Sequence, residues 1–311
     1  EAQRQRGRAS SQFSGVAERS KIYENLNIPA TQFLGYEALE VSAVIVALFK
    51  NDTLVDEAFE GDRVEIFLDQ TSFYPEGGGQ IADIGYIQNE NFQVEITDTK
   101  RVLGERISHV GVVVAGKLMV ESKVSAIINS DRRLDIARNH TATHLLHSAL
   151  RNILGDHVRQ AGSLVAEDRL RFDFTHVSGV SPDELTLIEN EVNKNIRNNL
   201  EIIKNESNFM EATKKGALAF FDERYGDTVR TIQIGIENPV SFELCGGTHI
   251  NYAGQIGFMK IIAESSVGSG IRRIEALTGR SSEQWMRSRL QILNDVVSKL
   301  RTNPSNLLLR I

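Results

Sequence analysis

The sequence has little cysteine, no long apolar run and no excess of basic residues. Cys245 is the only cysteine in 311 residues, so an internal disulfide is excluded and a reducing, cytoplasmic location is expected. No segment approaches the roughly 18 consecutive apolar residues that cross a bilayer, so no membrane partner is expected. The formal net charge is −6, so a nucleic-acid partner would require a local basic face.

Residues 33–128 carry the pattern of short β-strands. Runs such as VSAVIVALF and DRVEIFLD are rich in β-branched residues and are separated by turn-forming residues. Hairpins are expected at residues 89–91 and 115–117. This spacing of short strands predicts a small β-barrel over residues 33–129.

From Ser130 onward the apolar residues follow a helical period. The segment DRRLDIARNHTATHLLHSALRNIL predicts one long amphipathic helix that ends at Gly155. Ser181, Pro182 and Glu184 form the pattern of a capping box that opens a second helix. Strand-like and helical segments then alternate, and a final apolar stripe predicts a C-terminal helix. The predicted fold class is α+β, with a helical linker (1–32), a β-barrel (33–129), a mixed α/β domain (130–279) and the start of a helical domain (280–311).

Two pairs of side chains have the spacing of metal ligands. His140 and His144 lie one helical turn apart, so their imidazoles project from the same face. Cys245 and His249 have the same spacing around two glycines, and three imidazoles with one thiolate are the ligand types that fill a tetrahedral zinc shell. Taken singly, the histidine pair would be packing or surface residues and the cysteine a small apolar side chain. His147 shares the face of His144 and is interpreted as a residue behind the ligands or in the core.

The role of such an ion stays open from the residues alone. A metalloprotease helix would read His-Glu-x-x-His, but this one reads His140-Thr-Ala-Thr-His144 and lacks the glutamate base. Four protein ligands would close the shell of a structural ion. Hydrolysis needs a fifth coordination position or one ligand that yields to water or substrate.

Five motifs across residues 33–279 resemble the editing region of alanyl-tRNA synthetase and its freestanding relatives. In chain order they are FYPEGGGQIADIG, RNHTATHLLHSAL, residues 160–163 ahead of RFDF, ELCGGTH and VGSGIRRIEALTG. The resemblance implies a zinc-containing editing domain that hydrolyses seryl- or glycyl-tRNA of alanine identity, in a chain without an aminoacylation site. The flanking segments favour the synthetase over a freestanding deacylase, and the remaining synthetase domains would then be partners together with the tRNA(Ala) acceptor end.

The resemblance also assigns roles to individual residues. His140, His144, Cys245 and His249 fall on the zinc positions, and Thr143, Gln160, Ser163 and Arg272 fall on positions that shape the editing pocket. The residues expected on the substrate or tRNA side are Gly78, Gly79, Gln80 and Arg273. Without the resemblance, these polar residues would be interpreted as an ordinary back-bonded helix threonine, loop residues and an exposed arginine pair. The alternative functions are a zinc-stabilised tRNA-binding module without catalysis and a metallohydrolase that acts on another substrate.

Overall fold

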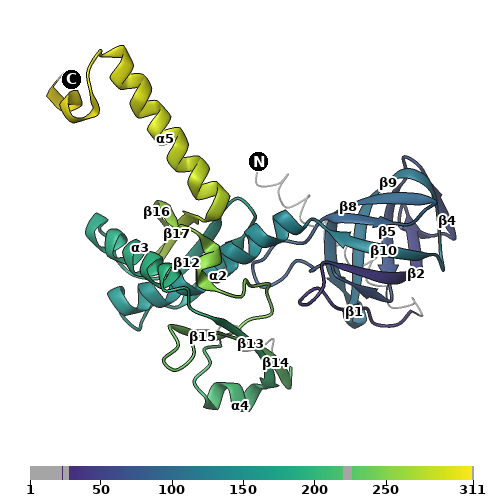
Figure 1. The fold of residues 1–311 in the computed structure, drawn as a ribbon. Coiled ribbons are helices and arrows are strands. Elements are labelled where there is room, and N and C mark those ends of the chain that lie inside the picture. The colour runs from purple at the N-terminus through teal and green to yellow at the C-terminus, as the bar shows by residue number, and fades with distance from the viewer. Residues whose placement is uncertain (1–22, 24–27, 220–225, 310–311) are drawn as a thin grey trace, which may run out of the picture. The chain divides into compact units, whose positions relative to one another are not determined.

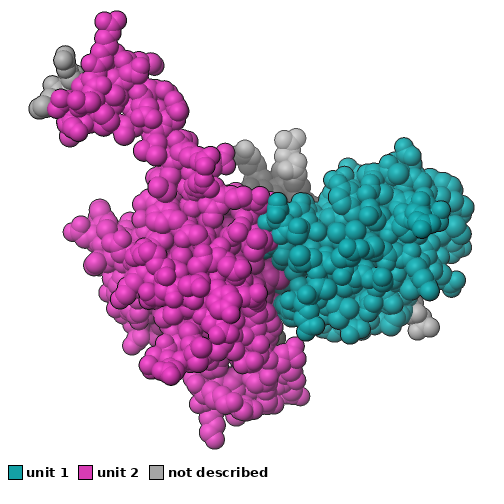
Figure 2. All heavy atoms as spheres, in the orientation of Figure 1, with its two compact units in different colours: residues 1–77, 81–133 teal, residues 78–80, 134–311 magenta. Residues whose placement is uncertain are grey.

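The computed structural model describes residues 23, 28–219 and 226–309, which divide into two compact units (Figure 2). The first unit comprises residues 1–77 and 81–133, and the second comprises residues 78–80 and 134–311. The helical linker predicted for residues 1–32 lies for the most part outside the described residues. The four-part division of the chain stays a prediction.

The first unit is a closed six-stranded β-barrel (Figure 1). Its strands follow the order β10-β7-β8-β9-β5-β2, and antiparallel pairing of β10 with β2 closes the ring. The predicted barrel is therefore confirmed. The strands are β1 (Gln32–Phe33), β2 (Glu40–Lys50), β3 (Thr53–Leu54), β4 (Glu57–Phe59), β5 (Arg63–Leu68), β6 (Gln70–Thr71), β7 (Gly85–Gln88), β8 (Phe92–Val102), β9 (Arg106–Met119) and β10 (Lys123–Ile128), with the 3-10 turn η1 (Leu103–Glu105).

Alternation along the strands fills the interior of the barrel. In β2, Val41, Ala43 and Ile45 are buried between more exposed neighbours, as the period of two requires. The hairpin predicted at residues 89–91 is confirmed, because β7 and β8 pair across it. The hairpin predicted at residues 115–117 is wrong. The long strand β9 passes through this stretch and pairs with β4 beyond it. The glycine at position 116 therefore lies within a strand, and the chain does not turn there.

The second unit combines two sheets with helices. A four-stranded antiparallel sheet has the order β11-β12-β17-β16, and a three-stranded sheet has the order β13-β14-β15. The strands are β11 (Gln160–Val165), β12 (Leu170–Thr175), β13 (Ile202–Asn208), β14 (Thr228–Ile234), β15 (Ser241–Leu244), β16 (Lys260–Gly268) and β17 (Ile271–Leu277). The helices are α2 (Ser130–Leu154), α3 (Pro182–Arg197), α4 (Phe209–Lys214) and α5 (Gly279–Lys299), with the 3-10 turns η2 (Ala253–Ile256) and η3 (Pro304–Leu309). The first turn of α2, residues 130–133, belongs to the first unit.

Helix α2 forms the centre of the second unit. Its Leu145 and Leu146 are fully buried in one apolar cluster with Phe172 and Phe174 of β12. Helix α3 begins as predicted, because the Ser181 side chain accepts from the backbone of Glu184 in a complete capping box. Helices α2 and α3 thus share one core with strands of both sheets, whereas α4 packs in a smaller cluster with β14 and β15.

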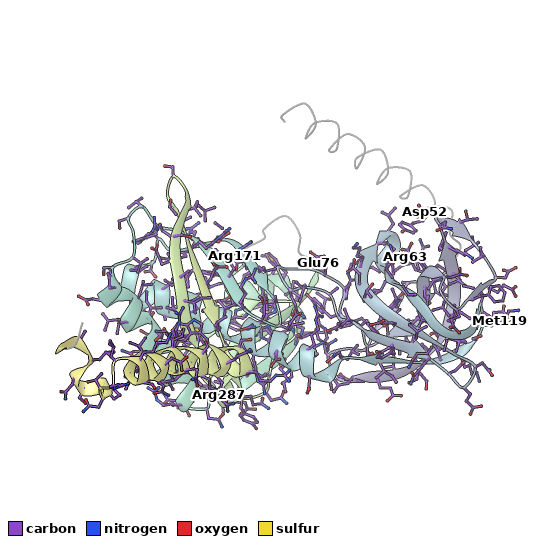
Figure 3. The ribbon with its side chains drawn as sticks, turned by 90° about the horizontal axis from the view of Figure 1, so that it is seen from above. Asp52, Arg63, Glu76, Met119, Arg171 and Arg287 are labelled. Atoms are coloured by element: carbon purple, nitrogen blue, oxygen red, sulfur yellow. The ribbon has the colours of Figure 1, made fainter. Side chains whose placement is uncertain are left out.

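Helix α5 extends away from this core (Figure 1), and among its residues only Ser282 is buried. Arg287, with 78% of its side chain exposed, projects from it (Figure 3). Over residues 28–219 and 226–309, no helix combines the length and apolarity needed to cross a bilayer. The C-terminal helix predicted from the apolar stripe is thus present and largely exposed.

Candidate metal centre

Helix α2 and the loop after β15 bring four potential ligands to one point in the second unit. On α2 the rings of His140 and His144 are stacked, with centroids 5.5 Å apart and planes 8° apart. Strand β15 ends directly before Cys245, and the following turn returns His249 to the same place. One ligand atom from each of the four side chains lies within 4.8 Å of the other three. The four residues therefore lie close enough to hold one metal ion.

The spacing of the donor atoms suits a small tetrahedral ion. Sγ of Cys245 lies 3.4 Å from Nε2 of His140 and 3.3 Å from Nε2 of His249. Zinc bonds of about 2.0 Å to nitrogen and about 2.3 Å to sulfur place those atoms about 3.5 Å apart in a tetrahedron. Nε2 of His144 is buried and finds no hydrogen-bond partner among the described residues. A buried polar atom without a partner is costly, so this nitrogen fits a metal ligand.

Each ligand imidazole has an acceptor on its Nδ1 atom. The three pairs are Gln80 Oε1 with His140 at 2.8 Å, a Glu243 carboxylate oxygen with His144 at 2.6 Å, and Thr141 Oγ1 with His249 at 3.0 Å. The Thr141 hydroxyl donates to the backbone oxygen of Ala137, so it is free to accept from His249. These contacts direct all three Nε2 atoms towards the common point.

Gly247 allows the ligand loop to approach α2 closely. A Cβ atom at this position would lie 1.9 Å from Cε1 of His140 and 2.9 Å from Oε1 of Gln80, so any side chain would displace both. Arg230 and Lys204 also hold this loop by donating to backbone oxygens. Arg230 contacts those of Cys245 and Gly247, and Lys204 contacts that of His249.

The electrostatics of the cluster favour the ionised thiol. Burial alone would raise the pKa of Cys245, but the His140 and His249 imidazoles lower it well below its ordinary value. At His144, burial alone would lower the pKa, whereas the Glu243 carboxylate and Cys245 raise it to about 10. Burial disfavours the charged carboxylate of Glu243, yet His144 and His147 hold its pKa below its usual range. The thiolate is the metal-binding form of cysteine, and ligation by His144 would release a proton.

Gln160 and Ser163 lie on one face of β11 because the strand is irregular. Residues three apart on a regular strand point to opposite faces. Here a β-bulge between Gln160 and Gly162 shifts the register, and Nε2 of Gln160 donates to Oγ of Ser163 at 3.3 Å. The backbone oxygen of Gly79 accepts from Val165, and a Cβ atom on Gly79 would lie 2.1 Å from Oγ of Ser163. Ser163 of the predicted pocket pair is thus packed against Gly79, which precedes Gln80.

The other predicted site residues already have partners within the protein. The Thr143 hydroxyl donates to the backbone oxygen of Asn139 at 2.8 Å, which is the back-bonded arrangement of a helix threonine. Arg272 forms a two-point ion pair with Glu264, and Arg273 forms one with Asp173. Gly78 has a positive φ of 60°, and a Cβ atom added to it would meet no atom within 4 Å.

Four side chains around the ligands were not predicted from the sequence, namely Glu243, Thr141, Arg230 and Lys204. Two of them stand inside the motifs already singled out, as Thr141 follows His140 and Glu243 precedes Cys245 by two positions. A carboxylate between Phe242 and Leu244 on the short strand β15 was an available signal. Arg230 and Lys204 lie on neighbouring strands, and no pattern in the sequence connects them with the ligand loop. His147, interpreted as lying behind the ligands or in the core, is 1% exposed and bonded to Glu243 at 3.1 Å.

Two protein-family models match parts of the chain. Residues 1–132 match the class II (A) tRNA synthetases, and residues 229–275 match the second additional domain of threonyl and alanyl tRNA synthetases. The second match includes Glu243 and both ligands of the loop after β15. The candidate metal centre thus lies partly inside a domain that is known from tRNA synthetases.

Whole-sequence comparison finds the same family. The chain is 47% identical over 298 residues to an alanine–tRNA ligase of Acetivibrio thermocellus, a match that covers 96% of the chain and 34% of that relative. It is 45% identical over 311 residues to the corresponding enzyme of Thermoanaerobacter sp. strain X514, covering 100% of the chain and 35% of the relative. The match to the Chloroflexus aurantiacus enzyme is 44% over 317 residues, with coverages of 99% and 35%. The chain thus spans about a third of the length of the curated relatives it matches.

Proposed function

The chain is homologous over nearly its whole length to alanine–tRNA ligases, and on this premise we propose that it hydrolyses misacylated tRNA(Ala), releasing serine or glycine. The observation that carries the proposal is the arrangement of the second unit. The two-residue segment of Gly79 and Gln80 connects the two groups of side chains. Gln80 bonds His140 of the four-ligand cluster, and Gly79 packs against Ser163, which accepts from Gln160. The proposed partner is the acceptor end of tRNA(Ala), and the proposed location is the cytoplasm. The other domains of the synthetase would be further partners.

Hydrolysis of an aminoacyl ester does not require a strong nucleophile. An aminoacyl ester is already activated, so the site must place a water molecule and stabilise the oxyanion that develops. His140, His144, Cys245 and His249 would hold zinc, which when bound supplies positive charge beside the ester. Gln160 and Ser163 bind and orient the aminoacyl group, since both present hydrogen-bonding atoms on the same face of β11.

Thr143 and Arg272 complete the proposed pocket. The Thr143 hydroxyl uses its proton on Asn139, so its oxygen accepts from a substrate O–H or N–H group. Arg272 is held by Glu264, which fixes its guanidinium and leaves its remaining N–H donors for a phosphate or ribose oxygen. Arg273 points to the opposite face of β17, as neighbouring residues of a strand do, and we place it at the tRNA side together with Gly78 and Gly79.

Discrimination against alanine follows from a polar pocket. Serine exceeds alanine by one hydroxyl, and an apolar pocket separates two such substrates only weakly. A pocket that hydrogen-bonds the hydroxyl, as the Gln160 and Ser163 pair is placed to do, rejects the residue that lacks it far more strongly. We therefore expect fast hydrolysis of seryl-tRNA(Ala) and slow hydrolysis of correctly charged alanyl-tRNA(Ala). Glycine also lacks the hydroxyl, so the proposed release of glycine follows from the family resemblance and not from this hydrogen bond.

A second candidate is a zinc-stabilised tRNA-binding module without catalysis. Four protein ligands would complete the tetrahedral shell of zinc, as in structural zinc sites, and would leave no position for water or substrate. This ligand number favours the module. The two functions differ in what Gln160 does. In an enzyme its loss lowers the rate of hydrolysis, whereas in a module there is no hydrolysis to lower.

The test is release of serine from seryl-tRNA(Ala) by the purified, zinc-loaded chain. We expect turnover of seryl- and glycyl-tRNA(Ala) and a Gln160→Ala variant that is at least tenfold slower with unchanged zinc content. Gln93→Ala, which removes a half-buried glutamine of β8 in the barrel, is the matched control and keeps the parent rate. A folded, zinc-loaded parent that releases neither amino acid would overturn the catalytic proposal in favour of the module. Turnover of small esters that is indifferent to tRNA would indicate a hydrolase of another class.

A further inference from the structure

We infer that Glu243 is a positioning residue for the metal centre. It orients His144 for ligation and supplies the second negative charge that a divalent ion in this site requires. The inference rests on the metal site proposed above and assigns a role to a residue outside the four ligands. Glu243 lies on β15, two positions before Cys245, and is 4% exposed.

The orientation of His144 depends on one carboxylate oxygen. Glu243 Oε2 lies 2.6 Å from Nδ1 of His144, so the hydrogen on that nitrogen is held and Nε2 is the atom left for the metal. The nearest ring neighbours of His144 are the other ligand imidazoles, with centroids 5.5 Å and 5.0 Å away. A carboxylate behind a ligating histidine fixes the ring and makes its free nitrogen a stronger donor.

The carboxylate itself is held at both oxygens. Oε1 lies 3.1 Å from Nδ1 of His147 and accepts from the Ser241 hydroxyl at 3.1 Å. His147 packs against Phe172, with ring centroids 5.2 Å apart, in the apolar core of the second unit. Glu243 therefore connects the core to the ligand cluster, and rotation of its side chain would break contacts at both ends.

The charge balance singles out Glu243 among the groups behind the ligands. A divalent ion with three neutral imidazoles and one thiolate carries a net charge of plus one, which is costly to bury. Gln80 and Thr141, which hold the other two imidazoles, are neutral. Among the described residues, Glu243 is the one carboxylate hydrogen-bonded to a ligand side chain, and its negative charge offsets the positive charge of the ion with its four ligands. The need for this charge is greater because the cationic side chains of Arg230 and Lys204 donate to backbone oxygens of the ligand loop.

The test compares zinc affinity in the parent and in Glu243→Gln, measured by competition with a chelator. Glutamine keeps the size of the side chain and an oxygen that accepts from His144, so the variant removes mainly the charge. We expect binding that is 10- to 100-fold weaker, the loss that follows removal of a group that orients a metal ligand. Glu189→Gln is the matched control, because Glu189 is another paired carboxylate of this unit, bonded to Lys260 and the backbone of Ile261. It should lose stability while keeping the parent zinc affinity.

A purely structural role for Glu243 would lower the urea midpoint of the metal-free protein and leave zinc affinity within twofold of the parent, and that result overturns the inference. If Glu243→Gln cannot be folded without metal, the rate of zinc transfer from the loaded proteins to excess chelator decides instead, with at least tenfold faster loss expected. A parent chain that binds no zinc would overturn the proposed metal centre itself. If the parent binds zinc and Glu243→Gln binds it with the same affinity, only the role of Glu243 is overturned.

Discussion

The side-chain oxygen of Gln80 lies 2.8 Å from Nδ1 of His140, although 60 positions separate the two residues in the chain. The same oxygen accepts from the backbone nitrogen of Thr248 at 2.8 Å, and the amide nitrogen donates to the Thr248 hydroxyl at 2.9 Å. One fully buried amide therefore holds His140 of α2 and the loop that carries Cys245 and His249. Gln80, which the sequence analysis expected on the substrate side, thus contacts one of the four potential metal ligands.

Replacing Gln80 by alanine should weaken zinc binding by roughly tenfold or more. The change removes the acceptor on His140 and leaves the backbone nitrogen of Thr248 without its partner. Chelator competition at neutral pH measures the effect, with Gln93→Ala as the control. Unchanged zinc affinity combined with slower hydrolysis would instead assign Gln80 to the substrate alone.

Gly247→Ala should abolish stoichiometric zinc binding. The added methyl group would lie 1.9 Å from His140, so the histidine or the loop must move and the four donor atoms would no longer converge. Metal content of the purified variant, determined by elemental analysis, tests this. Gly268→Ala is the control, because a Cβ atom there meets nothing within 4 Å, and it should retain one zinc ion per chain.

The barrel should lose stability as the pH falls from about 6.5 towards 4. His109 is fully buried, with Nδ1 against the backbone oxygen of Ile66 and Nε2 against the Thr71 hydroxyl, and burial lowers its pKa to about 4. In the unfolded chain the group protonates near pH 6.5, so between these values the unfolded state binds the extra proton and gains stability. The expected loss at pH 5 relative to pH 7.5 is about 2 kcal/mol.

Urea unfolding of the barrel at pH 7.5 and pH 5 measures this loss, with hydrogen exchange of the β5 and β9 amides as the local probe. His109→Gln provides the comparison, since glutamine offers a donor and an acceptor but does not titrate in this range. Its difference between the two pH values should be smaller by about 2 kcal/mol. An equal pH dependence in both proteins would contradict the assignment to His109.

Ser181→Ala should destabilise the second unit by about 1 kcal/mol. The serine hydroxyl caps α3 by accepting from the backbone nitrogen of Glu184, which is otherwise an unsatisfied donor of the first turn. The urea midpoint measures the change. Zinc affinity should stay at the parent value, because the cap makes no contact with the ligands, and a change in affinity would show that α3 is coupled to the metal centre.

Local patterns in the sequence predicted the elements and the ligand set. The helical period of α2, the capping box of α3 and the alternation within β2 each depend on neighbours a few residues apart, and such interactions are visible in a single segment. The same holds for the two ligand pairs, because a spacing of four on one helix or around one glycine turn already restricts where the side chains point. The wrong hairpin at residues 115–117 shows the limit, since a glycine in a strand has the same signature whether the chain turns or continues.

The sequence by itself therefore determined the class of the fold, the helix that carries His140 and His144, and the type of ion that the four donors suit. Only the tertiary structure decided how these donors are held. Gln80, Glu243 and Thr141 reach their histidines across separations of 60, 99 and 108 positions. Contacts over such distances depend on how sheets and helices pack, and the bulge that aligns Gln160 with Ser163 depends on pairing with β12. Neither packing nor strand register is encoded in the spacing of neighbouring residues, so the groups that prepare the site become apparent only in the folded chain.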